Sequence, residues 1–346
     1  MQVTVEEIAL ELKAPLVTAR GALERRRGFR VEIREGARVG LGEVTPPEEM
    51  GHDSAAAAER ALQGALVALS SAAVPHSLPE IRALMIGLAP LEASAAARHG
   101  VELALLDLAA AIRGIPLRVL LSAEARARVR VNALLSGDDV QEAAARAVER
   151  GFDTLKLKVG GRPPADDLER VKAIRARVGR GPRLRIDPNG SWSELEAIRA
   201  LREMARFDLE LCDQPVLDTD AMLRVRREAR VPIAADESLA LASWRPALSA
   251  GNVDVLVLKP MVLGGLLPAL DLALEAAHYE VGAYVTSSID GEIARAGAAH
   301  LAAAIPQTAW AHGLSTGDLL RDPGRTSWLA PERGEIALPD ARGLGV

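Results

Sequence analysis

The chain of 346 residues is 49% hydrophobic and 26% charged, which is ordinary for a globular protein built as one large domain or two. Its formal net charge of −5, with acidic and basic residues interspersed, argues against nucleic-acid binding, and no stretch approaches the roughly 20 apolar residues of a membrane span. A single cysteine, Cys212, rules out an intrachain disulfide framework, and the N-terminus does not resemble a signal peptide, so we expect a cytoplasmic protein away from membranes.

The first 45 or so residues have the alternation and turn residues of β-strands. The segment "FRVEIREGARVGLGEVTPP" alternates around a Glu-Gly turn and predicts a hairpin. Its Gly40-x-Gly42 pair is not followed by a helix, so we interpret it as a turn and not as a nucleotide-binding loop. Residues 53–115 have helical periodicity, and "AARHGVELALLDLAAAIRGIPL" predicts a long buried helix that ends at Gly114.

From about residue 128 onward, short apolar strands alternate with amphipathic helices such as 140–149 and 164–178. Eight strands with seven helices between them predict a parallel α/β fold, and their close spacing favours a closed barrel. An open doubly wound sheet would carry a Gly-rich turn after its first strand, and none is present. The predicted strands are "RVNALLSG", "TLKLKVG", "RLRIDPNG", "LELCDQP", "PIAADES", "VDVLVLKP", "VGAYVTSS" and "AWAHG".

In a parallel barrel the functional side chains gather at the carboxyl ends of the strands. Strand by strand, the sequence places lysines, then three acids, then a lysine at these ends. The acids and the last lysine follow one another at intervals of 26, 23 and 23 residues, about one strand–helix unit each. The polar residues concerned are Lys156 and Lys158, Asp187 and Asn189, Asp213, Asp236 and Glu237, Lys259, Ser287 and Ser288, and His312.

Three converging carboxylates would repel one another strongly in the mouth of a barrel. A hard divalent cation removes that repulsion, and Mg²⁺ suits three carboxylate ligands, with Mn²⁺ as a possible substitute. A carboxylate substrate bound there would have a more acidic α-proton, which one lysine could remove while other cations stabilise the enediolate. Lysine acts as a base only if its pKa falls, and a nearby cation and a second lysine both lower it.

The motifs "TLKLKVG", "RIDPNGSW", "CDQP", "AADESL" and "LKPMVLGGL", in this order, resemble those of the enolase superfamily. The lysine on the sixth strand is typical of the muconate lactonizing enzyme-like subgroup. The mandelate racemase-like branch has a histidine base on the seventh strand, and this chain has no histidine there. The resemblance covers nearly the whole chain, including "GLGEVTPP" and "ELALLDLAAAIRGIPL" before the barrel.

The resemblance implies a modified (β/α)7β TIM-like barrel with an α+β capping domain. We expect the cap in residues 1–115, the barrel in 116–320, and a segment that packs back on the cap in 321–346. It further implies proton abstraction next to a carboxylate.

By position in the motifs, the resemblance also assigns roles. Lys158 is the base, with Lys156 as its pKa-lowering, carboxylate-binding neighbour, and Lys259 stands on the opposite face. The metal ligands implied are Asp187, Asp213 and Asp236. One departure matters, because the family usually has glutamate where this chain has Asp213, and the shorter arm could shift the metal.

Within the subgroup, the segments "ARGALERRRGFRVEIREG" and "VTSSIDGEIARAGAAHLAAAI…AHGLSTGDLL" are most similar to those of o-succinylbenzoate synthases of menaquinone biosynthesis. Dipeptide epimerases usually have an Asp-x-Asp pair after the eighth strand, where this chain reads "HGLST". N-Succinylamino acid racemase uses nearly the same site, so racemase and epimerase activities stay open, as does muconate-type cycloisomerization. In each case the partner is a small carboxylate substrate.

Further residues are weaker candidates for the site. Arg20 could lie on a cap loop that closes over the substrate. Asn189 could orient water or close a turn, and Glu237 could contact a lysine or cap a turn. Ser287 and Ser288 could bind substrate oxygens.

The glycine pair Gly264 and Gly265 could present backbone N–H groups to the substrate or form a plain turn. A structural role is favoured for His312, and Cys212 should face the layer between barrel and helices.

Two readings outside the family remain. A Schiff-base aldolase could use one of the lysines without a metal, and a binding barrel could have lost catalysis through the change at Asp213. The sequence does not fix the oligomeric state, and a homo-oligomer stays open.

Overall fold

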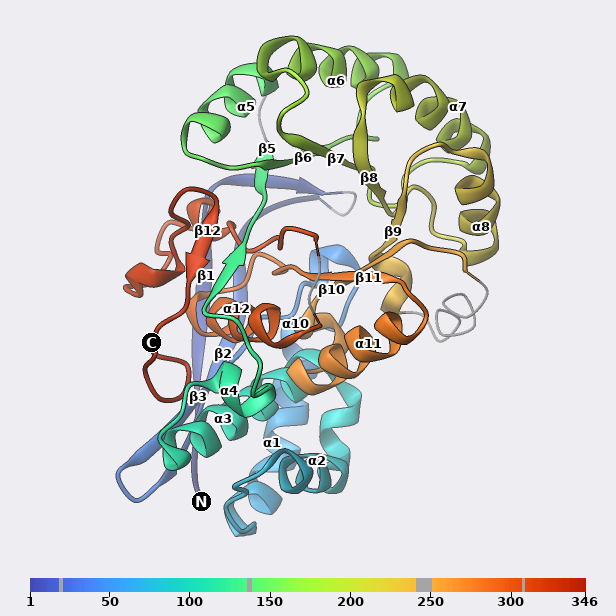
Figure 1. Cartoon of the computed structure of the whole chain (residues 1–346). Coiled ribbons are helices and arrows are strands. Elements are labelled where there is room, and N and C mark those ends of the chain that lie inside the picture. The colour runs from blue at the N-terminus through green and yellow to red at the C-terminus, as the bar shows by residue number, and fades with distance from the viewer. Residues whose placement is uncertain (19–20, 136–138, 241–250, 307–308) are drawn as a thin grey trace.

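Seven of the predicted strands form one parallel sheet in the computed structural model (Figure 1). The structure describes all residues except 19–20, 136–138, 241–250 and 307–308, and the side chains of 16–22 are also left aside. The strands pair in chain order, and each neighbouring pair is parallel. They are β5 (Ala133–Leu135), β6 (Thr154–Lys158), β7 (Arg183–Asp187), β8 (Leu209–Asp213), β9 (Ile233–Ala235), β10 (Val255–Leu258) and β11 (Gly282–Val285).

The two edges of this sheet are joined by one short segment near the end of the chain. His312 forms a parallel bridge with Val131, just before β5, and Gly313 forms another with Thr286, just after β11. The sheet therefore curls into a closed barrel, as predicted. The expected eighth strand "AWAHG" is wrong as a full strand, because only these two isolated bridges form there.

In the described residues, α-helices connect each pair of successive strands except β9 and β10, and they cover the outside of the sheet (Figure 1). Two of them, α5 and α6, begin and end at the predicted residues. Aspartate and serine side chains cap the starts of α5, α7 and α8 by accepting hydrogen bonds from backbone N–H groups of the first turn. Each of these helices therefore begins directly after its capping residue. The helices are α5 (Val140–Glu149), α6 (Pro164–Val178), α7 (Glu194–Met204), α8 (Thr219–Glu228), α10 (Pro260–Leu263), α11 (Leu266–His278) and α12 (Glu292–Ala304).

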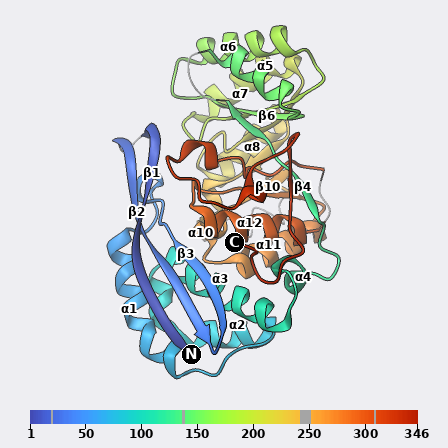
Figure 2. The same cartoon turned by 90° about the vertical axis from the view of Figure 1, so that its left-hand side faces the viewer.

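The N-terminal region is a three-stranded antiparallel sheet packed on helices. The hairpin predicted from "FRVEIREGARVGLGEV" is confirmed, with Gly36 in the left-handed region at its turn. The β1–β2 pair extends beside the barrel (Figure 2). The elements are β1 (Gln2–Thr18), β2 (Gly21–Glu35), β3 (Arg38–Val44), α1 (Ala55–Ser71), α2 (Leu78–Gly87), α3 (Ala95–Arg113) and α4 (Leu117–Leu121).

The turn predicted at Gly40-x-Gly42 is wrong, because both glycines lie inside β3. A Cβ atom at Gly40 would lie 2.0 Å from the carbonyl oxygen of Ala104, and one at Gly42 would lie 1.8 Å from that of Gly100. Glycine is therefore required for β3 to lie directly on α3. That helix is buried and ends at Gly114, as predicted.

The end of the chain returns to the first half of the molecule. Strand β12 (Glu335–Ala337) pairs antiparallel with β4 (Arg128–Arg130), and the N–H of Leu344 donates to Asp107 Oδ1 of α3 at 2.7 Å. The division of the chain at residues 115 and 320 stays a prediction. None of the helices in the described ranges is long and apolar enough to cross a membrane.

Candidate active site

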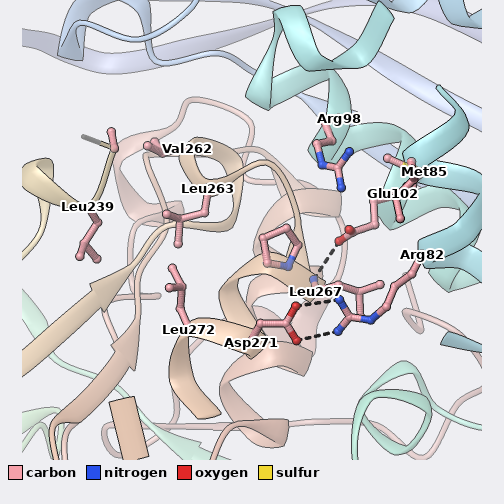
Figure 3. Close-up of a pocket in the computed structure, with 13 residues that line it drawn as sticks. Arg82, Met85, Arg98, Glu102, Leu239, Val262, Leu263, Leu267, Asp271 and Leu272 are labelled. Atoms are coloured by element: carbon pink, nitrogen blue, oxygen red, sulfur yellow. Dashed lines mark hydrogen bonds and ion pairs between the residues drawn. The ribbon is translucent and has the colours of Figure 1, made fainter. Parts of the chain in front are cut away.

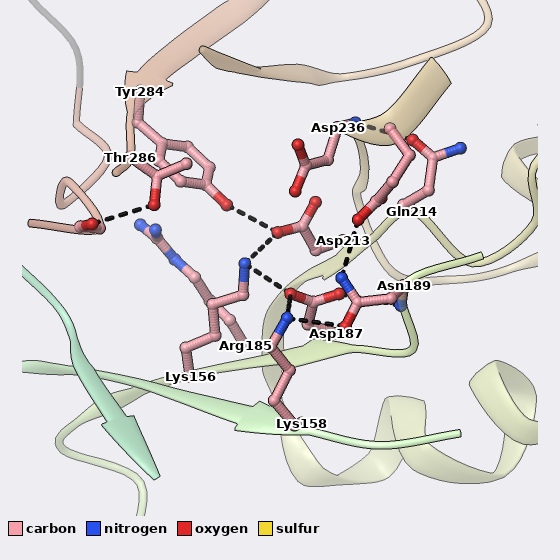
Figure 4. Close-up of polar contacts among 12 residues, drawn as sticks. Lys156, Lys158, Arg185, Asp187, Asn189, Asp213, Gln214, Asp236, Tyr284 and Thr286 are labelled. Atoms are coloured by element: carbon pink, nitrogen blue, oxygen red, sulfur yellow. Dashed lines mark hydrogen bonds and ion pairs between the residues drawn. The ribbon is translucent and has the colours of Figure 1, made fainter. Parts of the chain in front are cut away.

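The two lysines of the second strand and the three predicted aspartates lie together on the inner face of the barrel, and Figure 4 labels them as Lys156, Lys158, Asp187, Asp213 and Asp236. In the register, Lys156 lies opposite Arg185 and Lys158 opposite Asp187, so these side chains share one face. Asp213 pairs with Ala234, two residues before Asp236, which is the stagger expected where strands tilt around a barrel.

Lys156 lies beneath the acids and contacts two of them. Its ammonium is hydrogen bonded to Asp213 Oδ2 and lies 2.8 Å from Asp187 Oδ2. The side chain is only 10% exposed, and both carboxylates are fully buried. Lys156 therefore binds carboxylates of the protein itself.

Lys158 is nearer to solvent, with 48% of its side chain exposed. Its ammonium donates to Asp187 Oδ2 and to Asn189 Oδ1, both at 2.7 Å. Asn189 in turn donates to Glu237 Oε1 at 2.8 Å, with its backbone in the left-handed region. Asn189 thus links the second, third and fifth strands of the barrel.

Lys259 stands on the other side of the cluster. Its ammonium donates to Asp236 Oδ2 at 2.6 Å and lies 3.9 Å from Glu237 Oε1, so the expected contact between Glu237 and a lysine is confirmed. Gln214, which the sequence analysis did not single out, accepts the N–H of Asp236 at 2.7 Å and fixes the end of β9. Two lysines therefore approach the acids from opposite strands.

Burial and the charges of neighbouring groups shift the pKa values of the carboxyl and ammonium groups in this cluster. Burial raises the pKa of Asp236 to about 8, with Glu237 adding to the shift and Lys259 opposing it. Burial also raises the pKa of Asp213, against Lys156. Burial alone would lower the pKa of Lys156, but Asp187 and Asp213 outweigh it and hold that pKa well above its usual value.

The donor set fits a hard cation, although the acids are arranged around lysines. No group of three His, Cys, Asp or Glu side chains in the described ranges stands in metal-ligand geometry, and ammonium groups lie among the carboxylates. Asp213 Oδ1 and Glu237 Oε2 are buried with no hydrogen-bond partner within those ranges. An unpartnered buried carboxylate oxygen is costly, and a divalent cation with oxygen ligands would satisfy it.

The two serines at the end of the seventh strand are buried. Ser287 Oγ lies 2.6 Å from Thr316 Oγ1, while Ser288 Oγ has no partner among the residues described. His312 is structural, as favoured, since its Nδ1 accepts the N–H of Val285 at 3.0 Å. Cys212 is fully buried in the hydrophobic cluster that includes the outer helices, as expected.

The substrate-binding reading of the glycine pair is wrong. The N–H groups of Gly264 and Gly265 both donate to the carbonyl oxygen of Pro260, so neither is available to a substrate. Gly264 is the left-handed C-cap of α10, which is the plain-turn alternative. Arg20 lies outside the described residues.

A cavity of about 470 Å³ lies between helices α2 and α3 of the cap and the segments that follow β9 and β10 of the barrel (Figure 3). At its rim, Arg82 of α2 forms two hydrogen bonds of 2.7 Å with Asp271 of α11. Glu102 of α3 accepts the N–H of Leu267 at 2.9 Å. The residues lining this cavity include none of the lysines or aspartates at the strand ends.

Family comparisons agree with this architecture. Residues 139–346 match the family described as enolase C-terminal domain-like. Residues 1–122 match the family described as mandelate racemase / muconate lactonizing enzyme, N-terminal domain. The two matches together span both the cap and the barrel.

Individual relatives differ in activity. The chain is 39% identical to an o-succinylbenzoate synthase of Thermobifida fusca over 62% of this chain and 68% of the relative. It is 32% identical to the L-Ala-D/L-Glu epimerase of Bacillus subtilis over 88% and 84% of the two chains. The solved structure of a dipeptide epimerase from Enterococcus faecalis with Mg and the dipeptide L-Leu-L-Tyr superposes with a TM-score of 0.88 at 27% identity, covering 99% and 98% of the chains.

Proposed function

The chain belongs to the enolase superfamily, in its muconate lactonizing enzyme-like subgroup, and we propose that it is a Mg²⁺-dependent o-succinylbenzoate synthase. One observation carries the proton chemistry that the proposal needs: two lysines meet buried carboxylates from opposite sides, Lys158 at Asp187 and Lys259 at Asp236. Such a pair can remove a proton from one face of a substrate α-carbon and balance the resulting charge from the other.

The dehydration of 2-succinyl-6-hydroxy-2,4-cyclohexadiene-1-carboxylate uses these groups in a simple order. Mg²⁺ or Mn²⁺ held by Asp187, Asp213 and Asp236 would supply positive charge to the substrate carboxylate. Lys158 Nζ, in its neutral amine form, takes the α-proton, and the electrons of the C–H bond move into the carboxylate as an enediolate near the Lys259 ammonium. The electrons then return, the C–O bond breaks, and Lys158 gives its proton to the leaving hydroxyl, which releases water.

The end of the barrel supports a synthase over an epimerase of dipeptides. Residues 312–316 contain no acid that could hold a substrate ammonium. The next acid, Asp318, is 70% exposed and lies 3.5 Å from Arg150, on the outside. The higher local identity to the Thermobifida synthase points the same way.

A racemase or epimerase is the second candidate, because its relatives cover more of this chain. The same two lysines would then act in turn, one removing the α-proton and the other returning a proton to the opposite face. A muconate-type cycloisomerase is a third, supported by likeness to solved muconate lactonizing enzymes.

Purified protein with Mg²⁺ should convert the cyclohexadiene carboxylate to o-succinylbenzoate, followed by loss of diene absorbance, and EDTA should stop the reaction. In parallel, N-succinylamino acids and dipeptides are incubated in D₂O and followed by NMR. Absence of dehydration together with α-deuterium incorporation would replace the synthase with the racemase or epimerase. Activity that survives EDTA with borohydride trapping of a carbonyl substrate would favour a Schiff-base enzyme instead.

A further inference from the structure

Tyr284, in the middle of β11, reaches across the barrel to one of the acids (Figure 4). Its hydroxyl donates to Asp213 Oδ2 at 3.0 Å, and the side chain is fully buried. The ring packs in an interior cluster with Leu211, Val255 and Val257. The tyrosine hydroxyl therefore has its hydrogen-bond acceptor among the candidate metal ligands.

The ring of Tyr284 is held from below by a buried arginine. The guanidinium carbon of Arg185 lies 4.6 Å from the centre of the ring, within the range of a cation–π contact. Arg185 is itself fixed by an ion pair with Glu210 and by a hydrogen bond of 2.8 Å to the carbonyl oxygen of Ala311. The ring of Tyr284 is thus held by contacts other than the acid that its hydroxyl meets.

The two oxygens of Asp213 have different surroundings. Oδ2 accepts from both Tyr284 and Lys156, whereas Oδ1 has no partner within the described ranges and is buried. A carboxylate with two donors on one oxygen has its rotation fixed, so the other oxygen keeps one direction. The chain also has aspartate where its family usually has glutamate, and the shorter arm has less reach of its own.

We propose that Tyr284 is a positioning residue that fixes Asp213 so that Oδ1 serves a divalent cation, and that Tyr284 and aspartate at 213 work as a unit. The inference rests on the proposed function, because it takes Asp213 as a metal ligand. It predicts that the Tyr284 hydroxyl raises the affinity for Mg²⁺ when aspartate stands at 213. The hydroxyl should have little effect on this affinity when the longer glutamate stands there.

The test is a double-mutant cycle on Mg²⁺ affinity, measured by calorimetry without substrate. Tyr284→Phe removes one oxygen and should weaken binding about tenfold, the size expected for a hydrogen bond to a charged group. In the Asp213→Glu background the same change should alter affinity less than about twofold. Tyr279→Phe, at the other tyrosine of the chain, which is 44% exposed, is the matched control.

Affinity unchanged by Tyr284→Phe, or an equal loss in both backgrounds, would overturn the inference. If wild-type protein binds no Mg²⁺, the proposed function fails first, which separates the two outcomes.

Steady-state kinetics give a second readout: Tyr284→Phe should raise the Mg²⁺ concentration for half-maximal rate while kcat at saturating Mg²⁺ stays within about threefold. If Tyr284→Phe does not fold, Tyr284→Leu, which also lacks the hydroxyl, takes its place in both backgrounds, and the same two results decide.

Discussion

The molecule buries acids in two regions, and their partners differ. Where cap meets barrel, Glu43, Glu102 and Asp107 accept backbone N–H groups: Glu43 from Gly291 at the start of α12, Glu102 from Leu267 at the start of α11. None of the three forms an ion pair in the described ranges. Each holds a helix start or a chain segment in place, as expected of a carboxylate at positively polarised N–H groups.

At the strand ends, by contrast, the acids meet lysines. Asp187 and Asp213 share the ammonium of Lys156, Asp236 faces Lys259, and one oxygen of Asp213 has no partner in the described ranges. Burial alone therefore does not distinguish a functional acid from a structural one. We propose that the kind of partner does, because a backbone amide stays in place while an ammonium can be exchanged for another cation.

The largest expected effect is on the rate of catalysis at the strand ends. Lys158→Ala should lower kcat by about 10³-fold, within the range for general acid–base catalysis, while Mg²⁺ still binds. The matched control is Lys172→Ala, at an exposed lysine of α6 that pairs with Glu169. Substantial activity in the Lys158 variant would show that this lysine is not the base.

Lys156→Ala should act mainly on stability. It removes the ammonium shared by two buried carboxylates, and breaking a buried pair costs about 3 kcal/mol. Turnover should fall less than in Lys158→Ala. Urea unfolding in EDTA measures the loss, which added Mg²⁺ should reduce; an unfolding free energy equal to wild type would contradict the reading.

The free energy of unfolding should depend on pH through a buried acid of the cap–barrel region, in addition to any effect of the strand-end acids. Burial raises the pKa of Glu102 from its usual 4.5 to about 7. Because the folded-state pKa is the higher one, this contribution to stability is complete below about pH 4.5 and is lost as pH rises through 7.

Wild type should therefore lose up to about 3 kcal/mol relative to Glu102→Gln over that window, since one pKa unit is worth about 1.4 kcal/mol. Urea unfolding at several pH values checks it, with the exposed Glu124→Gln as control. Parallel pH curves for wild type and Glu102→Gln would count against the assignment.

The smallest effect is expected at the rim of the cavity. Arg82 and Asp271 form a bidentate ion pair, but their side chains are 40% and 47% exposed. Exposed ion pairs contribute about 0–1 kcal/mol to the free energy of unfolding. Arg82→Met should change the unfolding free energy within that range and leave kcat unaltered. A larger loss would mean that this pair holds the cap on the barrel.

The sequence predicted the barrel and the strand-end acids because both depend on local periodicity. It failed where contacts are distant: Gly40 and Gly42 looked like a turn because the sequence does not show α3 lying against them. Tyr284 and Asp213 are 71 residues apart, and only the inward alternation along β11 hinted at the tyrosine. The role assigned to Gly264 was wrong because a helix C-cap and a substrate loop have the same glycine signature.

The central claim is that the strand-end acids serve a divalent cation and the cap–barrel acids do not. Calorimetric titration of Mg²⁺ into wild type, Asp213→Asn and Glu43→Gln tests it most directly. The account predicts one site per chain in wild type and in Glu43→Gln, and at least tenfold weaker binding in Asp213→Asn, which loses a charged ligand. No binding to wild type, or equal binding to Asp213→Asn, would contradict it.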